Sequence, residues 1–344
     1  MTPLTPVDPA SVTFLQVEPT TRCNFTCGFC CGRHMDQSDQ SWDDFQAALD
    51  AFPNLQHVEI QGEGEPLMHP QFFRMTALAR ERGIKASTIT NGSLIGRQIE
   101  RILDSGLASV MVSIESAVAE DFTLIRGGRL DDVTRGIGEL LRARAARGQA
   151  TPTVGFAMTV LRHTQDQLTP IFELYERLGM DGGILCHMLS DMTPYAQHYT
   201  DAMRSEVLPE LNQSLMWTRY ARNVKRPGYH ESPIRHFWND LMSTARNEQT
   251  GKAGVSAFTS CPWLDRSLFV NRHGLATACP NIKDTTRFAF GHVRTDGVER
   301  ILVARDGMRR QLATGAIPDA CRGCFIADSI AHSTRTPDRS PAEL

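Results

Sequence analysis

The sequence lacks three features that would each define a class of protein. No apolar run approaches the roughly 18 residues that a membrane-spanning helix needs. Lys and Arg number 36 against 39 Asp and Glu, so the net charge of -3 offers no basic field for nucleic acid. The N-terminal stretch MTPLTPVDPASVTF has neither the basic nor the apolar region of a signal peptide. We therefore expect a cytoplasmic protein that binds neither membranes nor nucleic acid.

What the sequence does contain is a large number of cysteines in an ordinary globular composition. The 344 residues, 41% of them hydrophobic, suffice for a large core and a second, smaller unit. Nine cysteines are too many to be packing residues alone. In a reducing compartment, cysteine groups bind metal more often than they form disulfides, so a metal centre is the first hypothesis.

Short β-branched segments alternate with helix-length segments through the first half of the chain. The predicted strands are VTFLQV (12–17), HVEIQG (57–62), KASTIT (85–90), SVMVSI (109–114), TVGFAMTV (153–160) and GGILCHML (182–189). Six β-α units at this spacing predict parallel strands with right-handed crossovers, in an incomplete barrel or a doubly wound sheet. Polar motifs follow the first four strands, and such folds carry their sites at these strand ends.

The first polar motif is TTRCNFTCGFCCGRH (20–34), in which Cys23, Cys27 and Cys30 have the spacing C-x3-C-x2-C. Three thiolates suit a [4Fe–4S] cluster with one iron that has no protein ligand, and an open coordination position leaves room for chemistry. A zinc knuckle or an oxidised surface group is the alternative. Cys31 has no place in the pattern, and we expect it to be a packed neighbour.

The arrangement C-N-x-x-C-x-aromatic-C after the first of six β-α units resembles the radical S-adenosylmethionine (SAM) enzymes. The resemblance implies that Cys23, Cys27 and Cys30 bind the cluster, with Asn24 in the usual second position and Phe29 beside the adenine. In that family, the amine and carboxylate of SAM chelate the open iron. Reductive cleavage of SAM gives a 5′-deoxyadenosyl radical, which abstracts hydrogen from the substrate. A flavodoxin- or ferredoxin-type protein is the expected electron donor.

Motifs after the next strands fit the same family. GEGEPLMHP (62–70) resembles its Gly-Gly-Glu-Pro segment, with Glu63 in place of the first glycine. The resemblance implies that Gly64 lets the backbone approach the ligand and that the Glu65–Pro66 segment holds the SAM amino group. In TNGS, SIES and LIRGG, the expected SAM-binding residues are Asn91, Ser113, Glu115 and Arg126. The Arg is expected to pair with the SAM carboxylate.

A second group of cysteines lies near the C-terminus. Cys261, Cys279, Cys321 and Cys324 follow the order C…G-x4-C…C-x2-C, and Gly274 is placed to turn a hairpin in SLFVNRHGLATAC. This order resembles the twitch domain, a shortened relative of the SPASM domain. The resemblance implies a second, auxiliary [4Fe–4S] cluster with all four irons held by protein. Structural zinc is the alternative from spacing alone.

Together these patterns predict the domain order of the chain. We expect an N-terminal tail (1–11), a partial (β/α)6 TIM-like barrel (12–195), a helical segment (196–255), a twitch/SPASM-like domain with a β-hairpin (256–330) and a loose C-terminal tail (331–344). The helical segment is expected to cover part of the pocket. Candidates to meet substrate carboxylate or hydroxyl groups, with solvated surface as the alternative, are Tyr195 just ahead of this segment and, within it, His198, Arg226, His230, Arg235 and His236.

Three functions remain open at this level. The first is a radical SAM enzyme that dehydrogenates, epimerises or decarboxylates a polar small molecule, such as an amino sugar, aminocyclitol or nucleoside sugar, in natural-product biosynthesis. Cys186 in the sixth strand would be the hydrogen donor in an epimerase, or else a small core residue. The second is a maturase of a ribosomally made peptide; only eleven residues precede the first strand, which favours the small molecule. The third, an electron carrier or metal-bound scaffold, conflicts with the SAM-pocket motifs.

Overall fold

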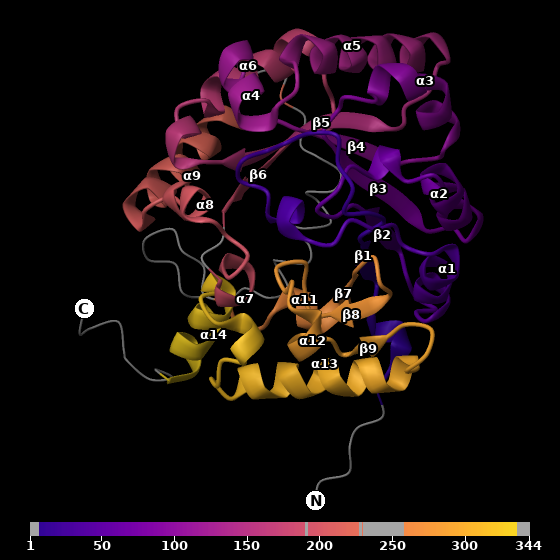
Figure 1. Cartoon of the computed structure of the whole chain (residues 1–344), viewed down its shortest axis with the longest axis vertical. Helices are drawn as coiled ribbons and strands as arrows, with labels where there is room; N and C mark the ends of the chain where they lie inside the picture. The colour runs from indigo at the N-terminus through magenta and orange to yellow at the C-terminus, as the bar shows by residue number, and fades with distance from the viewer. Residues whose placement is uncertain (1–6, 190–191, 227–228, 230–257, 336–344) are drawn as a thin grey trace, which may run out of the picture.

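A nine-stranded sheet forms the centre of the protein (Figure 1). The computed structural model describes residues 7–189, 192–226, 229 and 258–335. The strands are β1 (Phe14–Val17), β2 (His57–Ile60), β3 (Lys85–Thr90), β4 (Ser109–Ser113), β5 (Thr153–Val160), β6 (Ile184–Met188), β7 (Ser267–Val270), β8 (Leu275–Thr277) and β9 (Gly291–His292). Their order across the sheet is β6-β5-β4-β3-β2-β1-β7-β8-β9. All six strands predicted for the first half of the chain are confirmed.

Strands β1 to β6 are parallel, and each pairs with the next strand in the chain. A doubly wound sheet reverses its strand order at a switch point, and this sheet does not, so the partial barrel is the correct one of the two predicted architectures. Figure 1 shows the strands as an arc with α2, α3, α5 and α6 outside it. The helices of this part are α1 (Trp42–Asp50), α2 (Phe72–Glu81), α3 (Ile95–Asp104), α4 (Ala119–Arg126), α5 (Leu130–Ala146) and α6 (Leu168–Leu178).

The main core lies between the outer face of the sheet and these helices. Side chains alternate between the two faces of a strand. Val58 and Ile60 of β2 therefore face the helices and belong to the main core, whereas Glu59 faces inward. On the inner face, Met111 of β4 packs in a small separate cluster with Ala157 and Leu185. The inner face is thus only partly apolar.

The C-terminal unit continues the sheet of the barrel. β7 pairs with β1 in parallel, and β8 and β9 follow antiparallel. The predicted hairpin is β7–β8, and Gly274 makes its turn with a φ of 71°, a conformation that favours glycine. The remaining helices here are α11 (Pro262–Arg266), α12 (Thr285–Phe288), α13 (Val298–Ala313) and α14 (Phe325–Arg335). The sequence did not reveal that the two units share one sheet.

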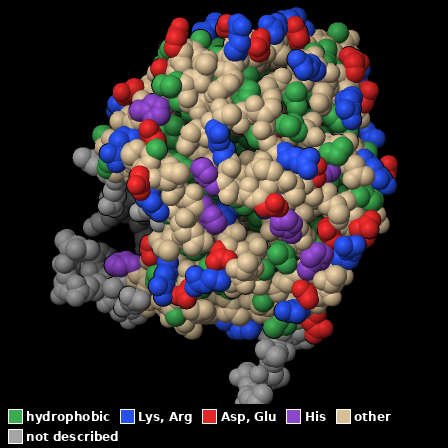
Figure 2. Space-filling view, in the orientation of Figure 1, with side chains coloured by type: hydrophobic (Ala, Val, Ile, Leu, Met, Phe, Trp, Pro, Cys, Tyr) green, Lys and Arg blue, Asp and Glu red, His purple; other side chains and the backbone are tan. Residues whose placement is uncertain are grey.

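The predicted helical segment is present where the structure describes it. Its described helices are α8 (Asp201–Ser205) and α9 (Glu210–Asn223), preceded by α7 (Thr193–Ala196). Residues 230–257 lie outside the described residues. Helix α14 continues to Arg335, into the segment that we expected to be a loose tail. None of the described helices is long and apolar enough to cross a membrane. Figure 2 shows acidic and basic side chains interspersed over one face of the molecule.

Candidate functional site

The three-cysteine loop leaves the carboxyl end of β1 and packs against the end of α4. Backbone N–H groups of Thr26 and Gly28 donate to the carbonyl oxygens of Arg126 and Ile125, at 2.9 and 3.1 Å. A Cβ on Gly128 would lie 2.1 Å from the ring of Phe25, so only glycine allows this close approach. The consecutive glycines of LIRGG therefore hold the cysteine loop in place, a role that the sequence reading missed.

Each of the three predicted cluster ligands lies beside a polar side chain from another part of the chain, Cys30 beside the carboxylate of Glu63. The side-chain amide of Asn91, after β3, donates to Cys23 Sγ at 3.6 Å. Arg126 Nη1 donates to Cys27 Sγ at 3.8 Å. Burial raises the pKa of the Cys27 and Cys30 thiols, and desolvation by neighbouring groups raises the pKa of Cys23, although Cys23 is exposed. Thiolates at these positions therefore need a bound cation, and the donors from Asn91 and Arg126 fit that anionic state.

Gly64 of the GEGEP segment packs on the cysteine loop itself. Its N–H donates to the carbonyl of Thr20 at 3.1 Å, and a Cβ would lie 2.5 Å from that oxygen and 2.6 Å from the carbonyl oxygen of Arg22. The need for glycine here is thus explained by backbone contact between two loops. The expected close approach of the backbone to SAM at this glycine stays a prediction.

Glu65 is buried, with 1% of its surface exposed, and binds the neighbouring loop. Its Oε1 accepts hydrogen bonds from the Thr90 hydroxyl at 2.7 Å and the Leu67 N–H at 3.0 Å, and its Oε2 accepts one from the Asn91 N–H at 2.7 Å. Burial raises the pKa of this carboxyl, and these hydrogen bonds oppose the rise. The Glu65 side chain therefore joins the ends of β2 and β3, and Pro66 begins the following short helix.

Glu115 and Arg126 pair with each other. Both Nε and Nη2 of Arg126 donate to the Glu115 carboxylate, the second at 2.6 Å to Oε1, and both side chains are buried. Burial alone would lower the pKa of Arg126, but Glu115 outweighs it and the pKa is raised. The guanidinium lies 5.9 Å from the centre of the half-buried Phe29 ring. Ser113, half-buried at the end of β4, is in register with Ala157 on the inner face.

Cys186 lies on the outer face of β6. It is in register with Met158, whose side chain belongs to the core under the helices, and its Sγ lies 3.6 Å from Met216 Sδ of α9. This orientation contradicts the hydrogen-donor role, which needs a thiol on the inner face. His187 follows it on that inner face, accessible to solvent but with a pKa that burial lowers, as expected for a group inside a hollow.

Polar residues predicted to meet a substrate fall into three groups. Arg226 pairs with Glu176, with Nε 2.7 Å from Oε1, and so joins the end of α9 to α6. Tyr195 and His198 lie near Lys283 of the C-terminal unit. The others, His230, Arg235 and His236, lie outside the described residues.

The second cysteine group is brought together from distant parts of the C-terminal unit. All nine cysteines of the chain are free thiols. Burial, with a smaller contribution from the other thiols of the group, raises the pKa of Cys279 and Cys321 to about 12. Cys261 interacts in the same way with Cys279 and Cys324. Among the described residues, no three His, Cys, Asp or Glu side chains come close enough to share one metal ion.

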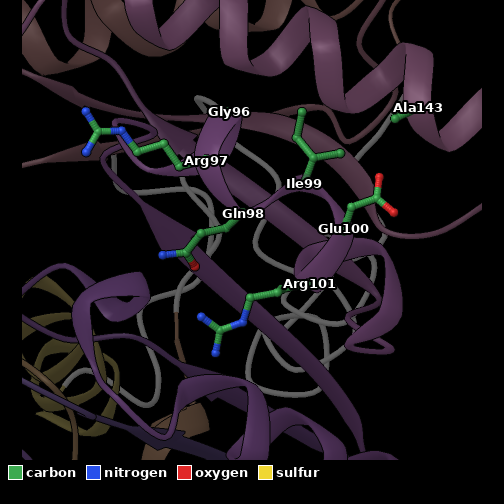
Figure 3. Close-up of a pocket in the computed structure, with 7 residues that line it drawn as sticks. All are labelled: Gly96, Arg97, Gln98, Ile99, Glu100, Arg101 and Ala143. Carbon is green, nitrogen blue, oxygen red and sulfur yellow. The ribbon is translucent and has the colours of Figure 1, made fainter.

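A surface pocket on the outer layer contains none of the predicted site residues (Figure 3). Its volume is about 340 Å³, and it is lined by residues 96–101 at the start of α3 and by Ala143 of α5. The three-cysteine loop lies at the carboxyl edge of the parallel strands instead. We therefore place the candidate site at the strand ends, where the cysteines and the buried charges are.

Residues 17–175 match the family model of the Radical SAM superfamily, so this part of the chain is a radical SAM domain. The chain is 28% identical over 188 residues to the tungsten-containing aldehyde ferredoxin oxidoreductase cofactor-modifying protein of Pyrococcus furiosus. This alignment covers 53% of this chain and 52% of the relative. It is 30% identical over 169 residues to the AdoMet-dependent heme synthase of Nitratidesulfovibrio vulgaris, covering 47% of this chain and 44% of that protein. The chain thus spans about half the length of these curated relatives.

Two solved structures show the same fold. SuiB of Streptococcus suis, bound to S-adenosylmethionine, has a TM-score of 0.66 at 14% identity, covering 92% of this chain and 74% of SuiB. The anSMEcpe structure with bound AdoMet and a peptide has a TM-score of 0.62 at 15% identity, covering 88% of this chain and 83% of that one. The partial barrel and its C-terminal continuation are therefore shared with radical SAM proteins of known structure.

Proposed function

We propose that the chain is a radical SAM enzyme in which Cys23, Cys27 and Cys30 hold a [4Fe–4S] cluster that binds SAM. One observation carries the proposal: at the carboxyl edge of a radical SAM domain, two of the three thiols of the loop, Cys23 and Cys27, meet donors from Asn91 and Arg126. The SAM bound in the SuiB and anSMEcpe structures supports the choice of cofactor. When bound, the cluster supplies the electron that cleaves SAM reductively, so that hydrogen is abstracted from a substrate C–H.

The protein's own contribution is to arrange charge around this centre. Arg126 faces Cys27 with a permanent positive charge, held by the Glu115 carboxylate. Glu65 fixes the β2 and β3 loops to each other and so positions the Asn91 side chain over Cys23. Each contact fixes a group that meets the thiolates or SAM, and such preorganisation keeps the catalytic geometry within narrow limits.

For the C-terminal unit, we propose an auxiliary [4Fe–4S] cluster on Cys261, Cys279, Cys321 and Cys324, in a twitch-like domain. Support comes from the mutual proximity of four free thiols, which interact electrostatically with one another. A cluster binds each thiolate to a separate iron, whereas zinc draws four sulfurs to about 2.3 Å from one point. Such a cluster would exchange electrons with the substrate radical.

The proposed substrate is a polar small molecule that is dehydrogenated or decarboxylated. Ser113 and His187 present hydroxyl and imidazole groups on or beside the inner face, and Thr159 is in register with His187. Hydrogen-bonding groups of this kind suit sugar or cyclitol hydroxyls. Because Cys186 faces outward, epimerisation through that thiol is not part of the proposal.

A second candidate is the modification of a peptide. The SuiB structure with its precursor peptide SuiA matches this fold with a TM-score of 0.66, and the anSMEcpe structure also contains a peptide. At 14 and 15% identity these likenesses concern the fold, so the substrate must be decided by experiment.

Stimulation of SAM cleavage separates the two candidates. The protein would be reconstituted anaerobically with iron and sulfide, given SAM and reductant, and mixed with small-molecule or peptide fractions of host extract. We expect the small-molecule fraction to raise 5′-deoxyadenosine formation above the background without substrate. Stimulation by the peptide fraction alone would establish the second candidate. No 5′-deoxyadenosine under any condition would contradict radical SAM activity.

A further inference from the structure

A buried ion pair joins the C-terminal unit to the GEGEP segment. Lys283 Nζ lies 2.5 Å from Glu63 Oε1, and the two side chains are 4% and 14% exposed. Lys283 follows Cys279 of the second cysteine group by four residues, and Glu63 follows β2. The pair therefore spans the two cysteine groups, and neither residue belongs to the proposed ligand sets.

Glu63 is held against the first cysteine group. Its Oε2 lies 3.5 Å from Cys30 Sγ, and its N–H donates to Glu18 Oε1 at 3.1 Å. A Cβ on Gly32 would lie 2.6 Å from Glu63 Cβ, so the cysteine loop packs tightly on this side chain. The loop therefore packs on the base of the Glu63 side chain, whose carboxylate lies beside Cys30.

Lys283 supplies the charge that compensates this carboxylate. Its Nζ lies within direct ion-pair distance of Glu63 Oε1, on the carboxylate whose other oxygen faces Cys30. The ring centres of Tyr195 and Phe269 lie 5.4 and 5.6 Å from Nζ and flank it without offering a competing negative charge. Seen from Cys30, the pair is close to neutral; without the Lys, one negative charge would remain beside the sulfur.

We propose that Lys283 is a positioning residue that sets the charge beside the SAM-binding cluster, so that a residue of the C-terminal unit controls the reduction potential of the first cluster. The inference rests on the proposed function. Reduction adds a negative charge to the cluster, and an uncompensated carboxylate nearby makes that addition less favourable. Loss of Lys283 therefore makes the cluster harder to reduce, while loss of Glu63 makes it easier.

The test is anaerobic redox titration of the reconstituted protein, followed by electron paramagnetic resonance (EPR). The signal to follow is the one that changes on addition of SAM. Lys283→Met removes the charge at similar length, Glu63→Gln removes its partner, and a third variant carries both changes. Lys85→Met is the matched control, because Lys85 is exposed at the amino end of β3, the end opposite the site.

We expect K283M to shift the potential of this signal downward, E63Q to shift it upward, and the double variant to return it towards wild type, with K85M unchanged. If K283M keeps the wild-type iron content and circular dichroism spectrum but its potential is unchanged, the inference is overturned and the proposed function stands. If K283M does not fold, an unchanged potential in E63Q overturns it instead. A wild type without any SAM-responsive signal overturns the proposed function and the inference together.

Discussion

The carboxylate of Glu65 accepts a hydrogen bond from the backbone N–H of Asn91 at 2.7 Å, which ties the loop after β2 to the loop after β3. Asn91 in turn donates its side-chain amide to Cys23 Sγ. A chain of contacts thus runs from a fully buried acid to a cysteine at the site. Glu65 of the GEGEP segment therefore affects the position of Asn91 beside Cys23, although both of its own oxygens accept hydrogen bonds from protein donors.

Replacing Glu65 tests this link. Glu65→Ala leaves the Thr90 hydroxyl and the Leu67 and Asn91 N–H groups without their acceptor. A buried group left unsatisfied costs about 1–3 kcal/mol, so we expect a loss of at least that size in the free energy of unfolding. Urea unfolding of the metal-free protein measures it, with the exposed Glu81→Ala as control. Equal stability of E65A and E81A would refute the link.

The Arg126–Glu115 pair gives a second prediction. Arg126→Met leaves the Glu115 carboxylate buried and unpaired, and breaking a buried pair in this way costs about 3–5 kcal/mol. The double variant R126M/E115Q should recover part of that loss, because no buried charge remains. Urea unfolding of the two variants decides the matter. If the double variant were less stable than R126M, the buried-charge explanation would be wrong.

The two faces of β6 predict opposite results for neighbouring residues. Cys186→Ala should leave substrate-stimulated 5′-deoxyadenosine formation unchanged, because the thiol packs on α9. His187→Ala should reduce it, because the imidazole lies on the inner face beside Thr159. Both variants would be assayed with the same stimulating fraction. Loss of stimulation in C186A with normal activity in H187A would reverse the assigned faces.

Two titratable side chains of β2, His57 and Glu59, predict opposite dependences of folding stability on pH. Burial lowers the pKa of His57 to about 4, with a smaller contribution from Lys85. Its folded pKa lies below the unfolded value of about 6.5, so the unfolded state binds the proton first and stability falls as pH drops from 6.5 to 4. Burial raises the pKa of Glu59 to about 7. The folded state then binds the proton first, and stability falls as pH rises from about 4.5 to 7.

Single variants separate the two effects. Glu59→Gln leaves the His57 contribution, so we expect stability about 2 kcal/mol lower at pH 5 than at pH 7. His57→Gln leaves the Glu59 contribution, so stability should be higher at pH 5 than at pH 7. Urea unfolding at the two pH values checks both. The same pH dependence in both variants would show that these groups are not buried as described.

The auxiliary cluster is tested by removing two of its ligands. Cys321→Ala with Cys324→Ala should abolish substrate turnover but leave SAM cleavage measurable, because the first cluster keeps its own thiolates. Iron content after reconstitution should fall by about half, since one of two clusters is lost. Wild-type turnover in this variant would sink the proposed role, and unchanged iron with bound zinc would favour the structural alternative.

Much of the fold could be predicted from sequence, because alternating β-branched strands and helix-length segments fix the β-α order. The side of Cys186 could not be predicted. A parallel strand buried on both faces reads as a nearly continuous apolar run, and the one polar residue of GGILCHML, His187, does not by itself show whether the polar side of the strand faces inward or outward. The sequence therefore predicted where strand β6 lies in the chain, but not which of its side chains face the inside of the barrel.

Within the site, local motifs located the loops but did not reveal all the contacts that their residues make. Gly64 was found as a glycine that something must approach closely, yet what approaches it is the backbone of the cysteine loop. Lys283 was missed altogether, because its partner Glu63 lies far away in sequence and neither belongs to a spaced motif. The departure from glycine at Glu63 was the one signal that pointed to it.

The most direct measurement of the central claim is anaerobic SAM cleavage by a variant without the three predicted ligands. Wild type and the triple variant Cys23→Ala, Cys27→Ala, Cys30→Ala would be reconstituted and reduced in parallel, with Cys186→Ala as a control for loss of a thiol. We predict 5′-deoxyadenosine from wild type and C186A, and none from the triple variant. Equal 5′-deoxyadenosine formation by the triple variant and wild type would contradict the claim that these cysteines hold the SAM-binding cluster.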